Sequence, residues 1–233
     1  MEYHLHRFTK PIMIKSGHAV LPALLTLPPK AKRLVVFAHG RGSSRFSARN
    51  QYLAKKLHKN QIATLLFDLL TPEESAEDAL SAKMSFNIAL LTERLLDATL
   101  VAEEHIPTIG YFSFSTGAAA ILAASLKKTI STVVCSSGRA DLIWDQLPLV
   151  KTPTLFIAGG SDFTHLLAKR AFRKLTCRKK MTIIPGANSL FEERGKLEKM
   201  SETALQWFIK YLKPKKRAAN LKALLHQKAR STL

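Results

Sequence analysis

Cysteine is scarce in this chain of 233 residues, which contains only Cys135 and Cys177. The two form no C-x-x-C pair and no cluster with metal-ligand spacing, so we expect neither a disulfide framework nor a metal site. Long apolar runs are also absent, because no stretch approaches the roughly 18 residues of a membrane span. Residues 1–10 (MEYHLHRFTK) lack the apolar core of a secretory signal. These absences predict a cytoplasmic protein with free thiols and no transmembrane segment.

Acidic residues are the second shortage, since 17 Asp and Glu stand against 36 Lys and Arg, a formal net charge of +19. No acid occurs from Phe163 to Phe191 or from Lys210 to Leu233. The first stretch carries Lys169, Arg170, Arg173, Lys174, Arg178, Lys179 and Lys180. Basic patches attract polyanions, and the tail, residues 214–233, is a candidate for such a contact. The alternative is a solvated basic face, because aromatic residues are not interleaved with these charges.

The remaining composition is that of a globular protein, with 46% hydrophobic and 23% charged residues. Short apolar runs alternate with helical patterns, which predicts an α/β fold with a doubly wound, mostly parallel sheet and helices on both faces. We expect one domain over residues 1–213, followed by the basic tail. The predicted strands are Tyr3–Ile14, His18–Leu27, Arg33–Ala38, Ile62–Phe67, Pro107–Phe112, Thr129–Cys135, Thr154–Ala158 and Met181–Ile184.

Helices are predicted between these strands, and two of them carry specific signals. Thr71-Pro72-Glu73-Glu74 is typical of a helix start, with Thr as N-cap and acids in the first turn. A longer helix is expected from Asp78 to Glu104, with a break near Ser81 as an alternative. The other predicted helices are Ser47–Asn60, Thr164–Leu175 and Leu197–Leu212, the last with Trp207 and Phe208 facing inward.

The stretch IGYFSFSTGAAAILAA, residues 109–124, combines the end of a buried strand, a tight turn and an Ala-rich helix. At a sharp strand-to-helix turn the central residue of a small-x-Ser-x-Gly pattern is forced into a strained conformation with its side chain exposed. This interpretation makes Ser115 a nucleophile, with the helix N-terminus pointing toward its target. The alternative is an ordinary strand–helix junction capped by a hydroxyl side chain.

Six segments in order resemble α/β-hydrolases, and more narrowly the dienelactone-hydrolase-related branch that includes phosphoribosyltransferase-associated hydrolases. They are VVFAHGRGSSRFSARN (35–50), ATLLFDLLTPEE (63–74), IGYFSFSTGAAA (109–120), SSGRADL (136–142), PTLFIAGGSD (153–162) and IPGANSLFEERG (184–195). The matches cover about residues 33 to 212 and include no phosphoribosyltransferase segment, so the chain resembles the free-standing hydrolase. The resemblance implies a serine hydrolase of carboxylic esters, thioesters or lactones, without a cofactor or metal.

The resemblance also assigns roles to single residues. Ser115 matches the nucleophile and Asp162 the acid of the triad. The oxyanion hole would use the backbone N–H groups of Thr116 and Arg41, in a site loop with His39, Gly40 and Gly42. The ligand would be a small ester-like molecule.

Three positions depart from the family pattern. Ser113 replaces a glycine, Phe46 replaces a histidine at the expected site rim, and Ser189 stands where relatives carry the triad histidine. A serine hydroxyl is not a base at neutral pH, so the chain is predicted to be a weak or inactive hydrolase. The alternative interpretation is that the chain is a pseudo-hydrolase, which binds a ligand, a nucleic acid or a partner through its basic surface.

Other residues are open alternatives for the missing roles. His165 follows Asp162 by three residues and is the alternative base, although a histidine at a helix start is more often solvated. His39 is expected to be structural. Asp68 and Asp141 follow strands and are alternative acids, but an acid alone does not replace the base.

Overall fold

The structure is a computed structural model that describes residues 8–161 and 163–214. Its strands are β1 (Phe8–Ser16), β2 (Ala19–Leu27), β3 (Leu34–Ala38), β4 (Ala63–Phe67), β5 (Ile109–Ser115), β6 (Thr132–Gly138), β7 (Thr154–Gly159) and β8 (Lys179–Ile184). Its α-helices are α1 (Ala48–Lys59), α2 (Pro72–Ser81), α3 (Ile88–His105), α4 (Gly117–Lys127), α5 (Thr164–Lys174) and α6 (Lys196–Tyr211). Two 3₁₀ helices, η1 (Ala140–Ile143) and η2 (Leu147–Leu149), were not expected from the sequence.

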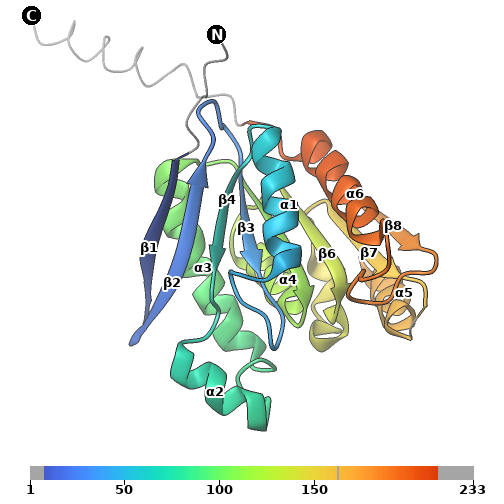
Figure 1. The fold of residues 1–233 in the computed structure, drawn as a ribbon. Coiled ribbons are helices and arrows are strands. Elements are labelled where there is room, and N and C mark those ends of the chain that lie inside the picture. Colours follow the sequence, from blue (N-terminus) through green and yellow to red (C-terminus); the bar gives the residue numbers. More distant parts are fainter. Residues whose placement is uncertain (1–7, 162, 215–233) are drawn as a thin grey trace, which may run out of the picture.

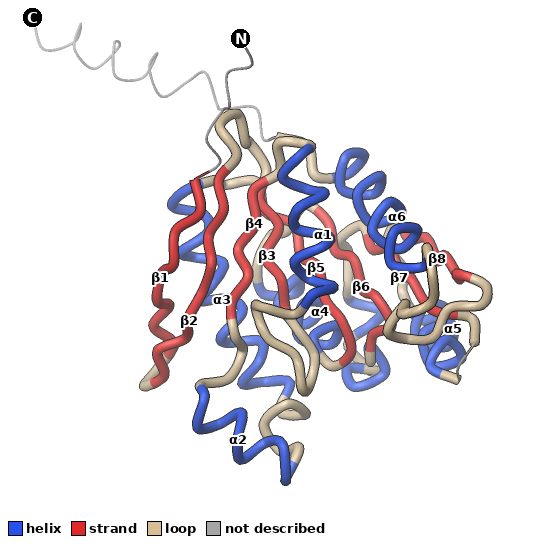
Figure 2. Tube along the Cα trace, viewed as in Figure 1, coloured by secondary structure: helices blue, strands red, loops and turns tan. Residues whose placement is uncertain are grey.

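The described strands form one eight-stranded sheet in the order β1-β2-β4-β3-β5-β6-β7-β8. β1 pairs with β2 and β2 with β4 in the antiparallel sense, while all pairs from β4 to β8 are parallel. Figure 2 shows the sheet as a continuous twisted layer with helices in front of it and behind it. The α/β-hydrolase fold expected from the sequence is confirmed by this topology.

The central strands are buried on both faces, which explains their near-continuous apolar sequences. In β3, Val36 lies in one hydrophobic cluster and Val35 in another, because successive side chains point to opposite faces of a strand. The first cluster is covered by α3, α4 and α5, and the second by α1 and α6 (Figure 1). The inward positions predicted for Trp207 and Phe208 of α6 are confirmed, since both are buried.

The expected helix from Asp78 to Glu104 is wrong as a single element, and the alternative break near Ser81 is confirmed. Ala82 ends α2 in the left-handed conformation, with φ of 56°. The Asp78 carboxylate then accepts the backbone N–H groups of Met84 and Ser85 at 2.8 and 2.9 Å, which holds the chain in a turn before α3 starts. The helix start at Thr71 is confirmed, because Thr71 and Glu74 form a reciprocal capping box.

Several element boundaries differ from the predictions by a few residues. β5 continues to Ser115 rather than ending at Phe112, and β6 runs over Thr132–Gly138 rather than Thr129–Cys135. The first predicted strand begins inside residues 1–7, which lie outside the described residues, as does the tail from residue 215. No described helix is long and apolar enough to cross a bilayer.

Candidate active site

Ser115 is the last residue of β5 and has a φ of +50°, a value that side-chain-bearing residues rarely adopt. The strained conformation predicted at this turn is therefore confirmed. The pairing of β5 with β6 is irregular at this turn, since the register shifts after Phe114 and Ser115 lies opposite Gly138. The N–H of Arg139 donates to the Ser115 carbonyl at 2.9 Å. Together these features hold Ser115 at the carboxyl edge of the sheet, where α4 begins.

Glycine residues let two neighbouring segments approach this turn. A Cβ on Gly117 would lie 2.5 Å from the carbonyl oxygen of Ala38, so a side chain there would collide with backbone at the end of β3. A Cβ on Gly40 would lie 2.5 Å from Ser115 Cβ and 3.3 Å from Ser115 Oγ. The loop after β3 therefore runs directly against the Ser115 side chain.

Two backbone N–H groups near Ser115 are open to a ligand. Neither the N–H of Thr116 nor that of Arg41 has a hydrogen-bond partner among residues 8–161 and 163–214. The Thr116 N–H follows Ser115 directly in the chain, and the Arg41 N–H belongs to the loop whose Gly40 lies against the Ser115 side chain. Within the described residues, the Ser115 hydroxyl itself also has no hydrogen-bond partner.

His39 is fixed by backbone groups on both sides of its ring. Nδ1 lies 2.9 Å from the Gly40 carbonyl oxygen, and Nε2 accepts the Leu69 N–H at 2.9 Å. Burial lowers the pKa of His39, outweighing the opposite effects of the Gly40 carbonyl and the Asp68 carboxylate. A neutral imidazole with both nitrogens bonded supports the structural role expected for it, because no nitrogen is left to act as a base.

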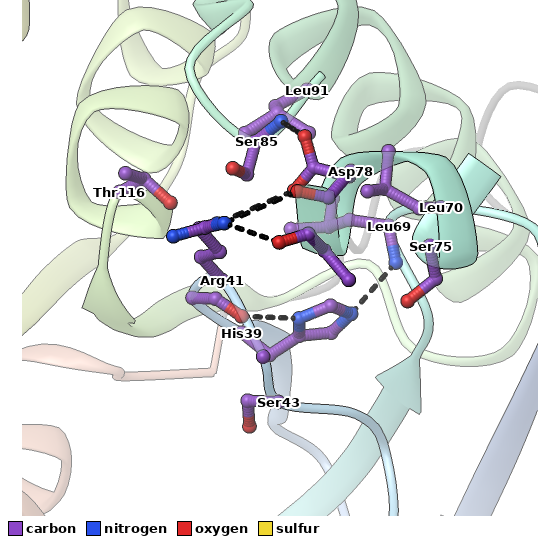
Figure 3. A pocket seen from close by; sticks show the side chains of 13 residues that line it. His39, Arg41, Ser43, Leu69, Leu70, Ser75, Asp78, Ser85, Leu91 and Thr116 are labelled. Carbon is purple, nitrogen blue, oxygen red and sulfur yellow. Dashed lines mark hydrogen bonds and ion pairs between the residues drawn. The ribbon is translucent and has the colours of Figure 1, made fainter. Parts of the chain in front are cut away.

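A cavity of about 490 Å³ opens beside Thr116 and the loop after β3 (Figure 3). Leu69, Leu70 and Leu91 form its apolar part. Its polar lining includes Arg41, Asp78 and the Thr116 hydroxyl, which is buried and has no hydrogen-bond partner in the part of the chain that the structure describes. An apolar pocket with a few polar groups suits a small organic ligand.

Arg41 spans this cavity from the loop after β3 to the end of α2. Its Nη2 donates to the carbonyls of Ala79 at 2.8 Å and Asp78 at 3.3 Å, and its Nε lies 3.9 Å from Asp78 Oδ2. Figure 3 shows the guanidinium between Asp78 and Thr116. Burial favours the protonated form of Asp78, but hydrogen bonds from Ser85 and Met84 and the charge of Arg41 outweigh it and lower the Asp78 pKa. The cavity wall thus carries an ion pair.

α2 is held over the cavity by a second ion pair at its first turn. The buried Arg94 of α3 donates to both oxygens of Glu74 at 2.6 and 2.7 Å, and to the Leu69 carbonyl at 2.7 Å. The hydrogen bond from Arg94 lowers the pKa of Glu74, against the smaller effect of burial. α2 is therefore anchored at its N-terminal end by Arg94 and at its C-terminal end by Arg41.

The predicted acid, Asp162, lies outside the described residues. The residues before it are joined to the loop that carries Ser189. Ser161 N–H donates to the Ala187 carbonyl at 2.9 Å, and Gly160 N–H to the Ile184 carbonyl at 3.0 Å. The segment after β7 and the segment after β8 therefore run side by side at the carboxyl edge of the sheet.

Ser189 lies in a tightly turned loop, partly buried. The Asn188 N–H donates to the Glu193 carboxylate at 2.9 Å, and Asn188 Oδ1 accepts the Leu190 N–H at 2.9 Å. Phe191 is buried at a φ of +58° and ends the turn. His165, the alternative base, is partly buried in the first turn of α5.

The two alternative acids are paired with arginines. Asp68 accepts the Arg45 N–H at 2.6 Å and forms an ion pair with the Arg45 guanidinium. The Asp141 carboxylate accepts two hydrogen bonds from the Arg139 guanidinium, one on each oxygen and each at 2.9 Å. Phe46, the residue that replaces a histidine, is 61% exposed, and its ring lies 4.2 Å from the Arg45 guanidinium carbon.

Sequence reasoning missed the contribution of α2 and its surroundings to the cavity. The lining residues not foreseen are Ser43, Leu69, Leu70, Ser75, Asp78, Ala79, Ser85 and Leu91. The helix-start signal at Thr71 predicted the helix but not its position above the site. Among the described residues, no group of three or more His, Cys, Asp or Glu side chains is arranged to hold a metal ion.

Comparison with known proteins gives relatives in both sequence and structure. Dienelactone hydrolase from Anabaena variabilis is 40% identical with a TM-score of 0.84, covering 89% of this chain and 99% of its own. A Mycobacterium tuberculosis protein named "Putative phosphoribosyl transferase" is 43% identical over 208 residues, which are 86% of this chain and 46% of that protein. The chain thus spans about half the length of this curated relative.

A cold-adapted esterase from an Arctic intertidal metagenomic library shares the fold, with a TM-score of 0.73 at 15% identity over 91% of this chain and 97% of that one. No family model matches the chain.

Proposed function

The chain belongs to the dienelactone hydrolase family of α/β-hydrolases, and from this premise we propose that it hydrolyses carboxylic esters, thioesters or lactones through Ser115. The observation that carries the proposal is the strained conformation of Ser115, with Gly40 of the loop after β3 directly against its side chain. Strain of this kind persists only where the surroundings enforce it, and it is concentrated at functional positions.

The proposed reaction is acyl transfer. The Ser115 oxygen attacks the carbonyl carbon and passes its proton to hydroxide, which becomes water, and the carbonyl oxygen becomes an oxyanion that the Thr116 and Arg41 N–H groups would stabilise. Collapse of this intermediate expels the alcohol or thiol, which takes up a proton, and leaves an ester on Ser115. Water then attacks that ester, releasing the acid and restoring the hydroxyl. The cavity beneath α2 would hold one side of the substrate.

Turnover in this scheme is slow, because Ser189 occupies the position from which relatives supply the base. In the best-studied serine hydrolase, loss of the triad histidine costs about 10⁶-fold in kcat, and about 10³–10⁴ over water remains from the oxyanion hole and binding. Asp162 would orient an imidazole if one were present, and by itself it cannot take the proton from Ser115.

Hydrolysis of an activated ester such as p-nitrophenyl acetate tests the proposal with three proteins. We expect slow turnover by the wild type, a further loss in Ser115→Ala, and a gain of about 100-fold or more in Ser189→His, since a positioned base contributes 10²–10⁴-fold. Labelling by a fluorophosphonate probe, which needs an activated serine, should follow the same order. Brisk turnover by the wild type that Ser115→Ala abolishes would contradict the weak-activity proposal and make His165 the suspected base.

The second candidate function is ligand binding without cleavage, and the observation in its favour is again Ser189. A pseudo-hydrolase would keep the cavity and bind a non-hydrolysable phosphonate analogue of an ester, while Ser115→Ala would change neither turnover nor probe labelling. Calorimetric titration of the wild type with the analogue, beside the ester assay, separates the two candidates. Binding with turnover that depends on Ser115 favours the hydrolase, and binding without such turnover favours the pseudo-hydrolase.

A further inference from the structure

The outer face of α5 carries apolar side chains at one end and cations at the other. Phe163, which precedes the helix, is 85% exposed, and Leu166 is 46% exposed. Arg170 and Arg173 follow on the same exposed side, at the three- and four-residue spacings of one helix face. The inner face carries the buried Ala168 and Ala171 together with the partly buried Phe172, whose ring centre lies 6.1 Å from that of Phe156 in β7. A shallow groove of about 640 Å³ runs along this stripe.

The cations of this face are available to a partner. Within the described residues, Lys169, Arg170, Arg173 and Lys174 form no ion pair with a carboxylate. Arg170 and Lys174 lie over the Trp144 ring, at 5.8 and 4.8 Å from its centre, which limits their freedom without neutralising them. The neighbouring Lys179 differs, because its ammonium donates to carbonyls at the end of α5, including Leu175 at 2.6 Å.

The apolar end of the stripe lies at the functional edge of the sheet. Phe163 comes four residues after Gly159, the last residue of β7, and β7 runs parallel to β5 through β6. The carboxyl ends of parallel strands meet at the same edge, so Phe163 and Leu166 are at the edge where β5 ends in Ser115. Figure 1 shows α5 at the β7–β8 side of the sheet.

We propose that this face of α5 docks on an anionic lipid bilayer, with Phe163 and Leu166 entering the interface and Lys169, Arg170 and Arg173 contacting acidic headgroups. Exposed apolar side chains flanked by unpaired cations suit a surface that offers negative charge above hydrocarbon. A nucleic acid fits less well, because the stripe offers one aromatic ring for base stacking, and Leu166 has no π-face. The proposal is independent of hydrolysis by Ser115.

Sedimentation of the full chain with vesicles tests the proposal. We expect binding to vesicles of phosphatidylcholine and phosphatidylglycerol at low salt, and little binding to phosphatidylcholine alone. The variant Lys169→Gln/Arg170→Gln/Arg173→Gln should bind about 100-fold more weakly, because each cation near an anionic membrane contributes roughly fivefold. Phe163→Ser/Leu166→Ser should also lose binding, with its charge unchanged. Four of the five side chains are exposed and Lys169 is partly buried, and circular dichroism verifies that the variants fold.

Matched variants separate this face from net charge and from apolar exposure elsewhere on the domain. Lys32→Gln/Lys55→Gln/Lys59→Gln removes the same charge from exposed positions elsewhere, and Leu100→Ser removes an exposed leucine of α3; both should bind vesicles like the wild type. Equal losses in the two charge variants would overturn the proposal, as would unchanged binding of Phe163→Ser/Leu166→Ser. Binding to a short single-stranded RNA without binding to vesicles would overturn it in favour of a nucleic acid.

Discussion

Gly40 and Ser115 approach so closely that one methyl group does not fit between them. A Cβ on Gly40 would lie 2.5 Å from Ser115 Cβ, where real Cβ atoms keep more than 3.0 Å, and 3.1 Å from the Phe114 carbonyl oxygen. The loop that carries the Arg41 N–H is therefore positioned by direct contact with the candidate nucleophile. A substitution at either residue should therefore alter the packing of the other.

Gly40→Ala should accordingly destabilise the fold, by about 2 kcal/mol, since overpacking of a tight site typically costs 1–3 kcal/mol. The reason is the collision with Ser115, so the cost should shrink in a Ser115→Gly background, where the colliding Cβ is gone. Urea unfolding of the two single variants and the double variant gives this coupling directly. If the two substitutions changed the free energy of unfolding additively, the collision between Gly40→Ala and Ser115 would not be the cause of the loss.

Local sequence signals predicted much of the fold and part of the site. The capping box at Thr71 needs only four consecutive residues, and the strain at Ser115 follows from a strand that turns sharply into a helix. The buried strands are visible as apolar runs because both faces of the sheet are covered. All of these features depend on neighbours in the chain.

Features that depend on distant residues could not be predicted in the same way. The end of α2 is set by Asp78, which looks like an ordinary helical residue until its carboxylate meets the N–H groups of Met84 and Ser85. The cavity wall requires Arg41 to reach a helix almost forty residues later in the chain. The contact between Ser161 and Ala187 likewise joins two loops that separate strands bring together.

The pH profile of ester hydrolysis should lack a histidine titration. In the wild type the rate should rise steadily with pH, because hydroxide rather than an imidazole takes the Ser115 proton. Ser189→His should add an inflection near the ordinary histidine pKa of about 6.5, with activity lost below it as the imidazole becomes protonated. A wild-type inflection in that region that disappears in His165→Gln would instead assign the base to His165.

Glu74→Gln should lower the free energy of unfolding at neutral pH by about 3 kcal/mol, because it leaves the buried Arg94 without its counter-charge. The folded-state pKa of Glu74 is depressed, so its stabilisation is present above the unfolded pKa and is lost as pH falls through the folded pKa. The difference between wild type and variant should therefore narrow in acid. Urea unfolding at neutral and acidic pH measures both effects.

Glu73→Gln is the matched control for this substitution, since Glu73 is the neighbouring acid, is exposed and accepts a hydrogen bond from the Thr71 hydroxyl rather than from a buried arginine. It should change stability little at either pH. Similar losses in the two variants would mean that helix-end charge, rather than the Arg94 pair, is responsible.

Arg41→Ala should release the C-terminal end of α2 while leaving its N-terminal end anchored. The variant loses the donor to the Ala79 and Asp78 carbonyls, whereas the Arg94–Glu74 pair remains. The loss of global stability should be below about 1 kcal/mol, because the Arg41 side chain is 42% exposed and its ion pair is screened by water. Hydrogen exchange should accelerate in residues 78–82 and stay unchanged in α3. Arg41→Lys keeps the charge without the planar guanidinium fork that reaches both carbonyls, so it should resemble Arg41→Ala; wild-type exchange in Arg41→Lys would show that charge alone holds α2 over the cavity.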